Sequence, residues 1–238
     1  MYDASFDGTG TKGRWLWIIR LAAVLAVVIA GSADAQMPGT PILQNAWATP
    51  GVVGAIDIGG GSDGSVYAAA ASWTPGSGRF EVSGGAGFAS HTGGSSGGVY
   101  GARVALPLGG ASGSFGFGAF AGIGGGGSVK RTTATTAGTI DSTSSSTQIP
   151  VGAAVGWRHA IGSARGFSIF GTPSYVFETG GGSGNKGLFR VGVGADFGIT
   201  SSLGATVGGE FGATRARGLG GPSGSLFGVG VSYAFGKR

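Results

Sequence analysis

The chain ends in a segment that reads Val229-Gly230-Val231-Ser232-Tyr233-Ala234-Phe235, in which the odd-numbered residues are large and apolar and the even-numbered ones small. Because successive side chains of a β-strand point to opposite faces of a sheet, this alternation predicts a strand with one apolar face. The same period of two recurs from Gly51 onward, and no helical stripe of apolar residues competes with it. The pattern predicts an all-β fold.

Ten such segments follow one another along the chain, each of roughly the ten residues that a tilted membrane-spanning strand needs. An even number of strands puts the two ends of the chain on the same, periplasmic side of the membrane. Eight strands are the alternative if the weakly alternating first hairpin is dropped. We therefore expect an antiparallel transmembrane β-barrel, with strands near residues 51–59, 65–73, 78–89, 98–107, 113–124, 148–158, 166–178, 187–199, 202–214 and 225–235.

Charged residues indicate which surface the apolar side chains meet. A Lys or Arg on the lipid face of a barrel costs about 2–4 kcal/mol at the midplane, so charges are expected to face the lumen. A soluble β-sandwich has the opposite sense, with its apolar residues inside. The charges well inside the predicted strands all lie on the parity opposite to the apolar one, and they form a predicted lumen charge network: Asp57, Glu81, Arg103, Arg158, Arg190, Asp196 and Glu210.

Aromatic residues and connection lengths distinguish the membrane barrel from the sandwich. Large aromatics collect at strand ends and leave smaller residues in the middle, which is typical of the two aromatic girdles of a membrane barrel. Short and long connections alternate, as expected for periplasmic turns and outer loops. The long connections are 91–97, 125–148, 180–186 and 215–223, and we expect the Ser/Thr-rich 125–148 segment to be a mobile loop.

The N-terminus has the pattern of a secretory signal. Basic residues precede the apolar run from Leu21 to Ala30, and Ala33-Asp34-Ala35 provides a small-residue cleavage site. We expect a cleaved signal helix in residues 1–35, a periplasmic lead segment in 36–50 and the barrel in 51–238. Glycine supplies 56 of the 238 residues without a collagen period, and there is no cysteine.

On these residues, the chain resembles the small outer-membrane barrels of Gram-negative bacteria, the OmpA/OmpX-type group in the broad sense. The final strand is similar to the C-terminal signal that the barrel-assembly machinery reads, with Val229, Val231, Tyr233 and Phe235 as its large residues, although Gly236-Lys237-Arg238 follow it. The resemblance implies a location in the cell outer membrane, with outer-membrane lipid and the assembly machinery as partners. It does not indicate an oligomeric state.

Most lumen positions carry small residues, so the few charges there draw attention. The hairpin that turns at Thr200 pairs residues whose numbers sum to 400 or 402; the first register places Arg190 opposite Glu210 and the second places them diagonally. Either register allows an ion pair. Such a pair acts as a strut for charges that cannot face lipid, or as a gate or selectivity element.

Other chemical sites are weakly indicated. His91 and His159 lie at opposite ends of the predicted barrel, and no sequence motif points to a metal, a cofactor or a nucleic-acid surface. An enzyme would need Asp63, Asp141 or Glu178 to meet His91 at the outer rim. Basic loop residues form a possible contact for lipopolysaccharide phosphates: Lys130, Arg131, Arg215 and Arg217.

Three functions stay open on the sequence. The first is a structural or surface-interaction barrel with a largely closed lumen. The second is a narrow, weakly selective porin for small solutes, and the third, least supported, is an outer-membrane enzyme. We expect a protein that is not an enzyme and that needs no cofactor.

Overall fold

The computed structural model describes residues 50–61, 64–91, 95–109, 113–126, 129–135, 138–161, 165–180, 185–212 and 225–235. Over these ranges the chain forms twelve β-strands. No helix among the described residues is long and apolar enough to cross a membrane. The predicted signal peptide (1–35) and all but the last residue of the predicted lead segment (36–50) lie outside the described residues.

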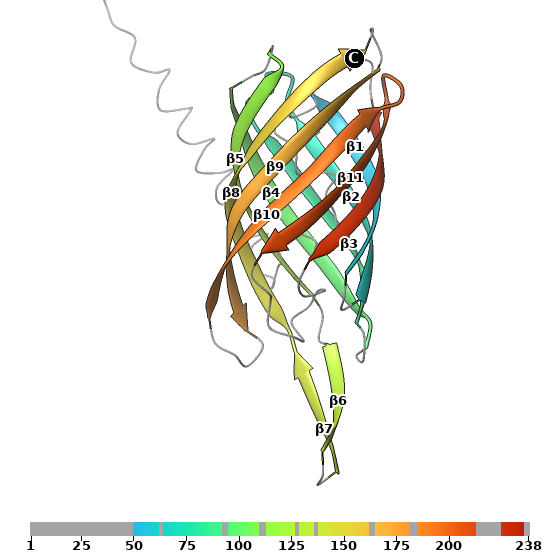
Figure 1. Ribbon diagram of the computed structural model, residues 1–238, viewed down its shortest axis with the longest axis vertical. Helices are drawn as coiled ribbons and strands as arrows, with labels where there is room; N and C mark the ends of the chain where they lie inside the picture. Colours follow the sequence, from blue (N-terminus) through green and yellow to red (C-terminus); the bar gives the residue numbers. More distant parts are fainter. Residues whose placement is uncertain are drawn as a thin grey trace, which may run out of the picture. The chain divides into compact units, whose positions relative to one another are not determined.

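Ten of the described strands close into an antiparallel barrel (Figure 1). β1 pairs with both β2 and β12, which closes the sheet, and β5 pairs with β8. The closed fold confirms the predicted ten-stranded barrel, and its first hairpin is a full part of it. The barrel strands are β1 (Gly51–Gly61), β2 (Gly64–Thr74), β3 (Glu81–His91), β4 (Gly97–Gly109), β5 (Phe115–Gly126), β8 (Ser146–Ile161), β9 (Arg165–Gly180), β10 (Lys186–Gly198), β11 (Leu203–Gly212) and β12 (Leu226–Phe235).

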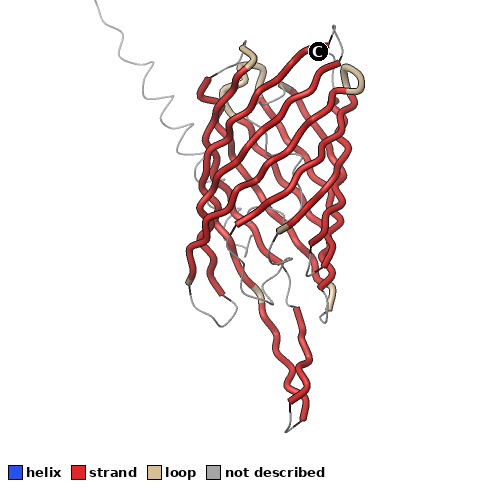
Figure 2. Tube along the Cα trace, in the orientation of Figure 1, coloured by secondary structure: helices blue, strands red, loops and turns tan. Residues whose placement is uncertain are grey.

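The strands run obliquely to the barrel axis (Figure 2). The burial patterns of the strands show that their side chains alternate between the interior and the outer face. On β12 the odd-numbered residues are exposed while Leu226, Gly228 and Gly230 are buried. Large apolar side chains cover most of the outer face of the barrel strands. Its exposed side chains include Ile56, Ile58, Phe88, Phe117, Val155, Ile169, Val193, Val207, Val229 and Val231.

The two ends of the barrel differ in their connections. We call the end that carries the β2–β3, β4–β5, β8–β9 and β10–β11 connections the turn end, and the opposite end the loop end. The β2–β3 turn is closed by the Gly78 N–H, which donates to the Pro75 carbonyl at 2.8 Å, and Gly78 has a φ of 63°, which glycine adopts without strain. In the β10–β11 turn, Thr200 Oγ1 accepts the N–H groups of Ser202 and Leu203.

The predicted loop 125–148 contains a second, separate sheet. β6 (Val129–Thr135) and β7 (Gly138–Ser144) form an antiparallel hairpin between β5 and β8. The mobility of this segment stays a prediction, but the expectation of a loop was wrong for these two ranges. The reason is that Thr favours strands even where no apolar alternation reveals them.

Candidate functional site in the barrel interior

The interior near the loop end is filled by buried side chains from eight strands. Apolar members such as Val66, Val99 and Leu226 are at most 2% exposed, and Val66, Ala89 and Val99 pack together as a cluster. Polar and charged members are equally buried. We call this set the loop-end ring; its members are Val66, Ala89, Val99, Gln148, Val176, Glu178, Leu188, Arg190, Glu210 and Leu226.

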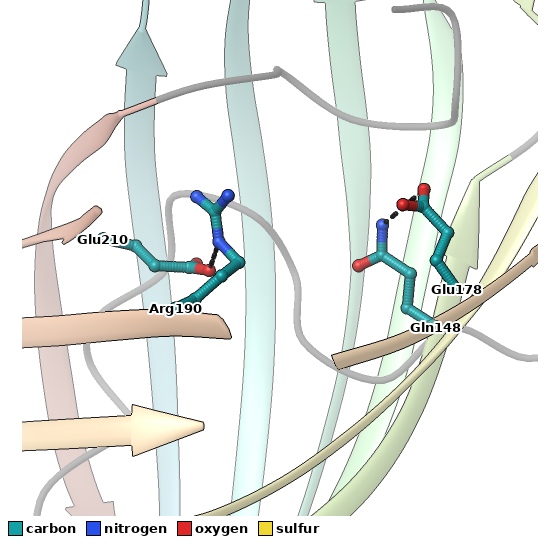
Figure 3. A network of polar contacts seen from close by, with 4 residues as sticks. All are labelled: Gln148, Glu178, Arg190 and Glu210. Carbon is teal, nitrogen blue, oxygen red and sulfur yellow. Dashed lines mark hydrogen bonds and ion pairs between the residues drawn. The ribbon is translucent and has the colours of Figure 1, made fainter. Parts of the chain in front are cut away.

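The Arg190–Glu210 ion pair is the most deeply buried charged contact of the ring. β10 and β11 pair in the register that sums to 402, so Arg190 lies opposite Gly212 and Glu210 opposite Gly192. The two side chains therefore meet diagonally, and the Nε–H of Arg190 donates to Oε1 of Glu210 (Figure 3). Arg190 is fully buried and Glu210 is 4% exposed. Such a pair is held by the surrounding wall, because separating it leaves a charge in a dry site.

A second polar contact of the ring joins β8 and β9. Gln148 and Glu178 are in register, and the Gln148 amide donates to Oε1 of Glu178 at 3.5 Å (Figure 3). Glu178 is 1% exposed. The sequence placed Glu178 among acids at the outer rim, but its side chain lies inside the wall, because it has the inward parity of β9 that it shares with the buried Val176. It is not available to a rim site with His91.

Nearer the turn end, Asp196 is held by the two strands beside it. It is in register with Ser168 on β9 and Thr206 on β11. Its carboxylate accepts the Ser168 hydroxyl at 3.1 Å and the Thr206 hydroxyl at 2.5 Å. On the other side of β9, Ser168 pairs with Arg158 of β8. The Nε–H of Arg158 donates to the Gly113 carbonyl at 3.1 Å. The polar groups on this part of the wall fix one another.

Arg103 and Glu81 lie on neighbouring strands of the opposite part of the wall. Arg103 pairs with Ser83, two residues from Glu81, and its guanidinium carbon lies 4.2 Å from the centre of the Phe120 ring. The Thr74 hydroxyl donates to Glu81 at 3.4 Å. A cation over an aromatic face is stabilised by the ring's quadrupole, so Phe120, the large inward residue of β5, helps to hold Arg103.

Asp57 differs from the other acids of the wall. It is fully buried, and neither of its carboxylate oxygens has a hydrogen-bond partner in the described part of the chain. Its register neighbours, Ala68 on β2 and Gly230 on β12, carry no polar side chain. Burial of the Asp57 carboxyl group therefore costs free energy of folding that no hydrogen bond from the described residues offsets.

The lumen charges thus lie along the whole wall and do not converge on one point. The seven predicted charges have the inward parity of their strands; Arg190 and Glu210 form an ion pair, and Arg103 lies diagonally across from Glu81 on the neighbouring strand. Among the described residues, no group of three or more His, Asp or Glu side chains is placed to hold a metal ion. Three of these charged side chains, nearer the turn end, are partly exposed, whereas the side chains of the loop-end ring are buried: Arg103, Arg158 and Asp196.

The remaining predicted sites lie elsewhere. His159 is exposed at the turn end of β8, and the His91 backbone ends β3 at the loop end. Lys130 and Arg131 are on β6, whereas Arg215, Arg217 and Asp63 lie outside the described residues. The large residues of the predicted assembly signal all lie exposed on the outer face of β12: Val229, Val231, Tyr233 and Phe235.

Comparison with known proteins gives a fold likeness only. No family model and no curated protein matches the chain. Among solved structures, it is similar to the N-terminal β-barrel domain of OprF from Pseudomonas aeruginosa, with 10% sequence identity and a TM-score of 0.39 over 77% of this chain and 96% of that chain. The closed antiparallel barrel itself agrees with the resemblance to OmpA-type barrels that the sequence indicated.

Sequence reasoning missed the neutral partners of the lumen charges and the apolar part of the ring. Gln148, Ser168 and Thr206 have inward parity, but that parity alone does not say which acid each one meets. A signal for the ring was present. Val66 and Leu226 are large residues on a parity that otherwise carries small ones, and such exceptions mark places where a lumen is filled.

Proposed function

We propose that this chain is an outer-membrane β-barrel protein with a structural or surface-interaction role, and that its lumen does not conduct in the resting state. The observation that carries this proposal is the burial of the loop-end ring. A side chain that lines a water-filled channel keeps surface that water touches. The ring residues keep at most 8% of theirs.

The membrane location is supported by the outer face. Phe88 is 70% exposed and Phe115 74%, and large apolar residues cover the outside of the described strands. In water such a surface causes aggregation, whereas in a bilayer it is solvated by lipid. Aromatic pairs lie toward both ends, with Trp73–Phe80 and Trp157–Phe167 at the turn end and Phe211–Phe227 at the loop end. This matches the two girdles of a membrane barrel.

A closed lumen is physically reasonable for this strand number, because barrels of this size have interiors just wide enough for side chains to fill. The ring contains both apolar packing and a buried ion pair, and each of these resists the entry of water for a different reason. Hydration of Val66 and Leu226 is unfavourable, and moving Arg190 away from Glu210 leaves an unpaired charge.

The narrow pore is the second candidate, and the turn-end half of the wall favours it. Glu81, Arg103, Asp196 and Arg158 keep partial exposure there, and the first two are of opposite sign to one another. A solute entering from the turn end meets polar groups as far as the ring. Conduction then requires the ring to rearrange.

Conductance measurements separate these two functions. The full chain is expressed in a Gram-negative host, purified from the outer-membrane fraction and added to a planar bilayer. We expect no current steps from the unmodified protein, and steps from a Val66→Gly/Leu226→Gly variant that thins the ring. A Phe227→Ala variant, altered on the outer face beside Leu226, serves as the control and should stay silent.

Reproducible current steps from the unmodified protein, changed in size by Glu210→Gln, would replace this proposal with the pore. Recovery of the chain from the soluble fraction of the cell would contradict the membrane location itself. If the unmodified barrel is silent, its surface role is to be sought in the loop-end segments. The β6–β7 hairpin is the largest of these that the structure describes.

A further inference from the structure

Two clusters of aromatic side chains lie at the turn end of the barrel, and one of them has an exposed arginine beside it. The β2–β3 patch consists of Trp73, Arg79 and Phe80. Trp73 is 49% exposed, its ring meets Phe80 edge to face with centroids 5.7 Å apart, and Arg79 is an exposed residue of the intervening turn. The turn is rigidified by the bond from Gly78 to Pro75. Arg79 directly precedes Phe80 in this turn, so an exposed cation lies beside the aromatic pair in the chain.

The β8–β9 patch repeats the aromatic part of this combination. It consists of Trp157, His159 and Phe167, whereas the intervening Arg158 has the inward parity of β8 and donates to the Gly113 carbonyl. Trp157 meets Phe167 edge to face at 5.3 Å, and the His159 ring stacks on Trp157 at 5.9 Å. His159 is exposed and lies in register with Phe167. Each described tryptophan thus stands at the turn end, with its ring edge to face against that of a phenylalanine.

The described side chains that face outward at the turn end include no acid. The segments 75–80, 113–114, 159–161, 166–167 and 199–203 contain Arg79 and His159 and neither Asp nor Glu. The nearest acids, Glu81 and Asp196, face the lumen and accept hydrogen bonds from Thr74 and from Ser168 and Thr206. At the loop end, by contrast, acids and bases are mixed. An exposed cation next to the exposed Trp73 indole complements an anionic surface.

We propose that the β2–β3 patch binds the headgroup of an anionic phospholipid in the membrane leaflet at the turn end. The arginine meets the lipid phosphate, the tryptophan lies at the headgroup level with its N–H available to an ester or phosphate oxygen, and the phenylalanine contacts the start of the acyl chain. The proposal rests on the proposed membrane location. It adds which lipid class the barrel prefers and where.

Quenching of tryptophan fluorescence by brominated lipids tests this proposal. The full chain is reconstituted into phosphatidylcholine vesicles and into vesicles of equal parts phosphatidylcholine and phosphatidylglycerol, with the bromine on one lipid or the other. The Trp73 signal is the difference between a Trp157→Phe chain and a Trp73→Phe/Trp157→Phe chain. It yields the binding of phosphatidylglycerol relative to phosphatidylcholine at the β2–β3 patch.

We expect phosphatidylglycerol to be preferred about fivefold, the factor that corresponds to about 1 kcal/mol for one basic group near an anionic membrane surface. Arg79→Gln should reduce the preference to about one. Lys186→Gln removes an exposed cation at the loop end and should leave the preference unchanged.

Equal quenching by the two lipids in the unmodified patch overturns the proposal. So does an equal fall in Arg79→Gln and Lys186→Gln, because the preference then belongs to net charge and not to the patch. Absence of quenching by either lipid is a different result. It means that Trp73 does not contact the bilayer, and it counts against the proposed membrane location.

Discussion

The buried ion pair between β10 and β11 allows a quantitative test of how the lumen is held. Arg190 is fully buried and Glu210 is 4% exposed, and the two are joined by an Nε–H to carboxylate bond. In Glu210→Leu the guanidinium keeps its dry site but loses its anion. In Arg190→Met the carboxylate loses its cation. The double variant replaces both charges by apolar side chains of similar size.

Removing one partner of a buried pair costs about 3–5 kcal/mol, because the remaining charge is uncompensated, whereas replacing both is often neutral. We therefore expect each single variant to lose about 3–5 kcal/mol of the free energy of unfolding. The double variant should lie within about 1 kcal/mol of the unmodified protein. The coupling energy from the cycle should then be about 5 kcal/mol or more, because the two single losses together exceed the loss of the double variant by at least that much.

The assay is reversible urea unfolding of the barrel in lipid vesicles, followed by tryptophan fluorescence and by the mobility shift of folded barrels in gels. Lys186→Gln, an exposed residue on the same strand as Arg190, controls for loss of positive charge and should change stability by less than about 0.5 kcal/mol. A double variant as unstable as the sum of the single ones would refute the reasoning, because it would show that the two side chains act independently.

Other parts of the wall give further tests by the same unfolding assay. No described residue donates a hydrogen bond to the Asp57 carboxylate, so Asp57→Asn should not destabilise the barrel. Asp196→Asn should cost about 1–3 kcal/mol of the free energy of unfolding, because two hydroxyl groups donate to the Asp196 carboxylate. A larger loss in Asp57→Asn than in Asp196→Asn would contradict these hydrogen-bond assignments. A Cβ on Gly152 would lie 2.5 Å from the Pro173 carbonyl oxygen, so Gly152→Ala should cost about 1–3 kcal/mol, while Gly171→Ala, with its nearest atom at 3.8 Å, should be tolerated. Equal effects would show that the interior is not closely packed there. Thr200→Val removes the acceptor of two turn N–H groups and should cost about 1 kcal/mol, and an unchanged stability would mean that water replaces the hydroxyl.

The strands and their facing were predictable because the alternation is a local property of the chain. Val229 to Phe235 already shows which residues of β12 face out, and the inward parity of Arg190 and Glu210 follows in the same way. The choice between the two registers of β10 and β11 was not local. It depends on the turn at residues 199–203, where Thr200 accepts two N–H groups and the Ile199 and Thr200 N–H groups both donate to the Leu203 carbonyl.

The contents of the lumen were less predictable, because they depend on strands that are distant in the sequence. The residues around Arg103 in the chain do not indicate that Phe120 on the next barrel strand lies against it. A bulge at Pro107 to Gly109, near the β4–β5 turn, shifts the register in which β4 and β5 pair. Likewise, the β6–β7 hairpin was missed because its polar residues show no apolar alternation. The β6–β7 hairpin is defined by the pairing of its two backbone strands and not by a pattern in its side chains.

Alternating access from lipid and from water along one strand is the most direct test of the membrane barrel. The chain has no cysteine, so single cysteines at Val229, Gly230, Val231 and Ser232 are the only thiols for a spin label. In the reconstituted protein, labels at 229 and 231 should collide with dissolved oxygen in the bilayer, and labels at 230 and 232 should not. Oxygen collision that is uniform along the four positions, or greatest at 230 and 232, would contradict a β12 whose odd-numbered face meets lipid.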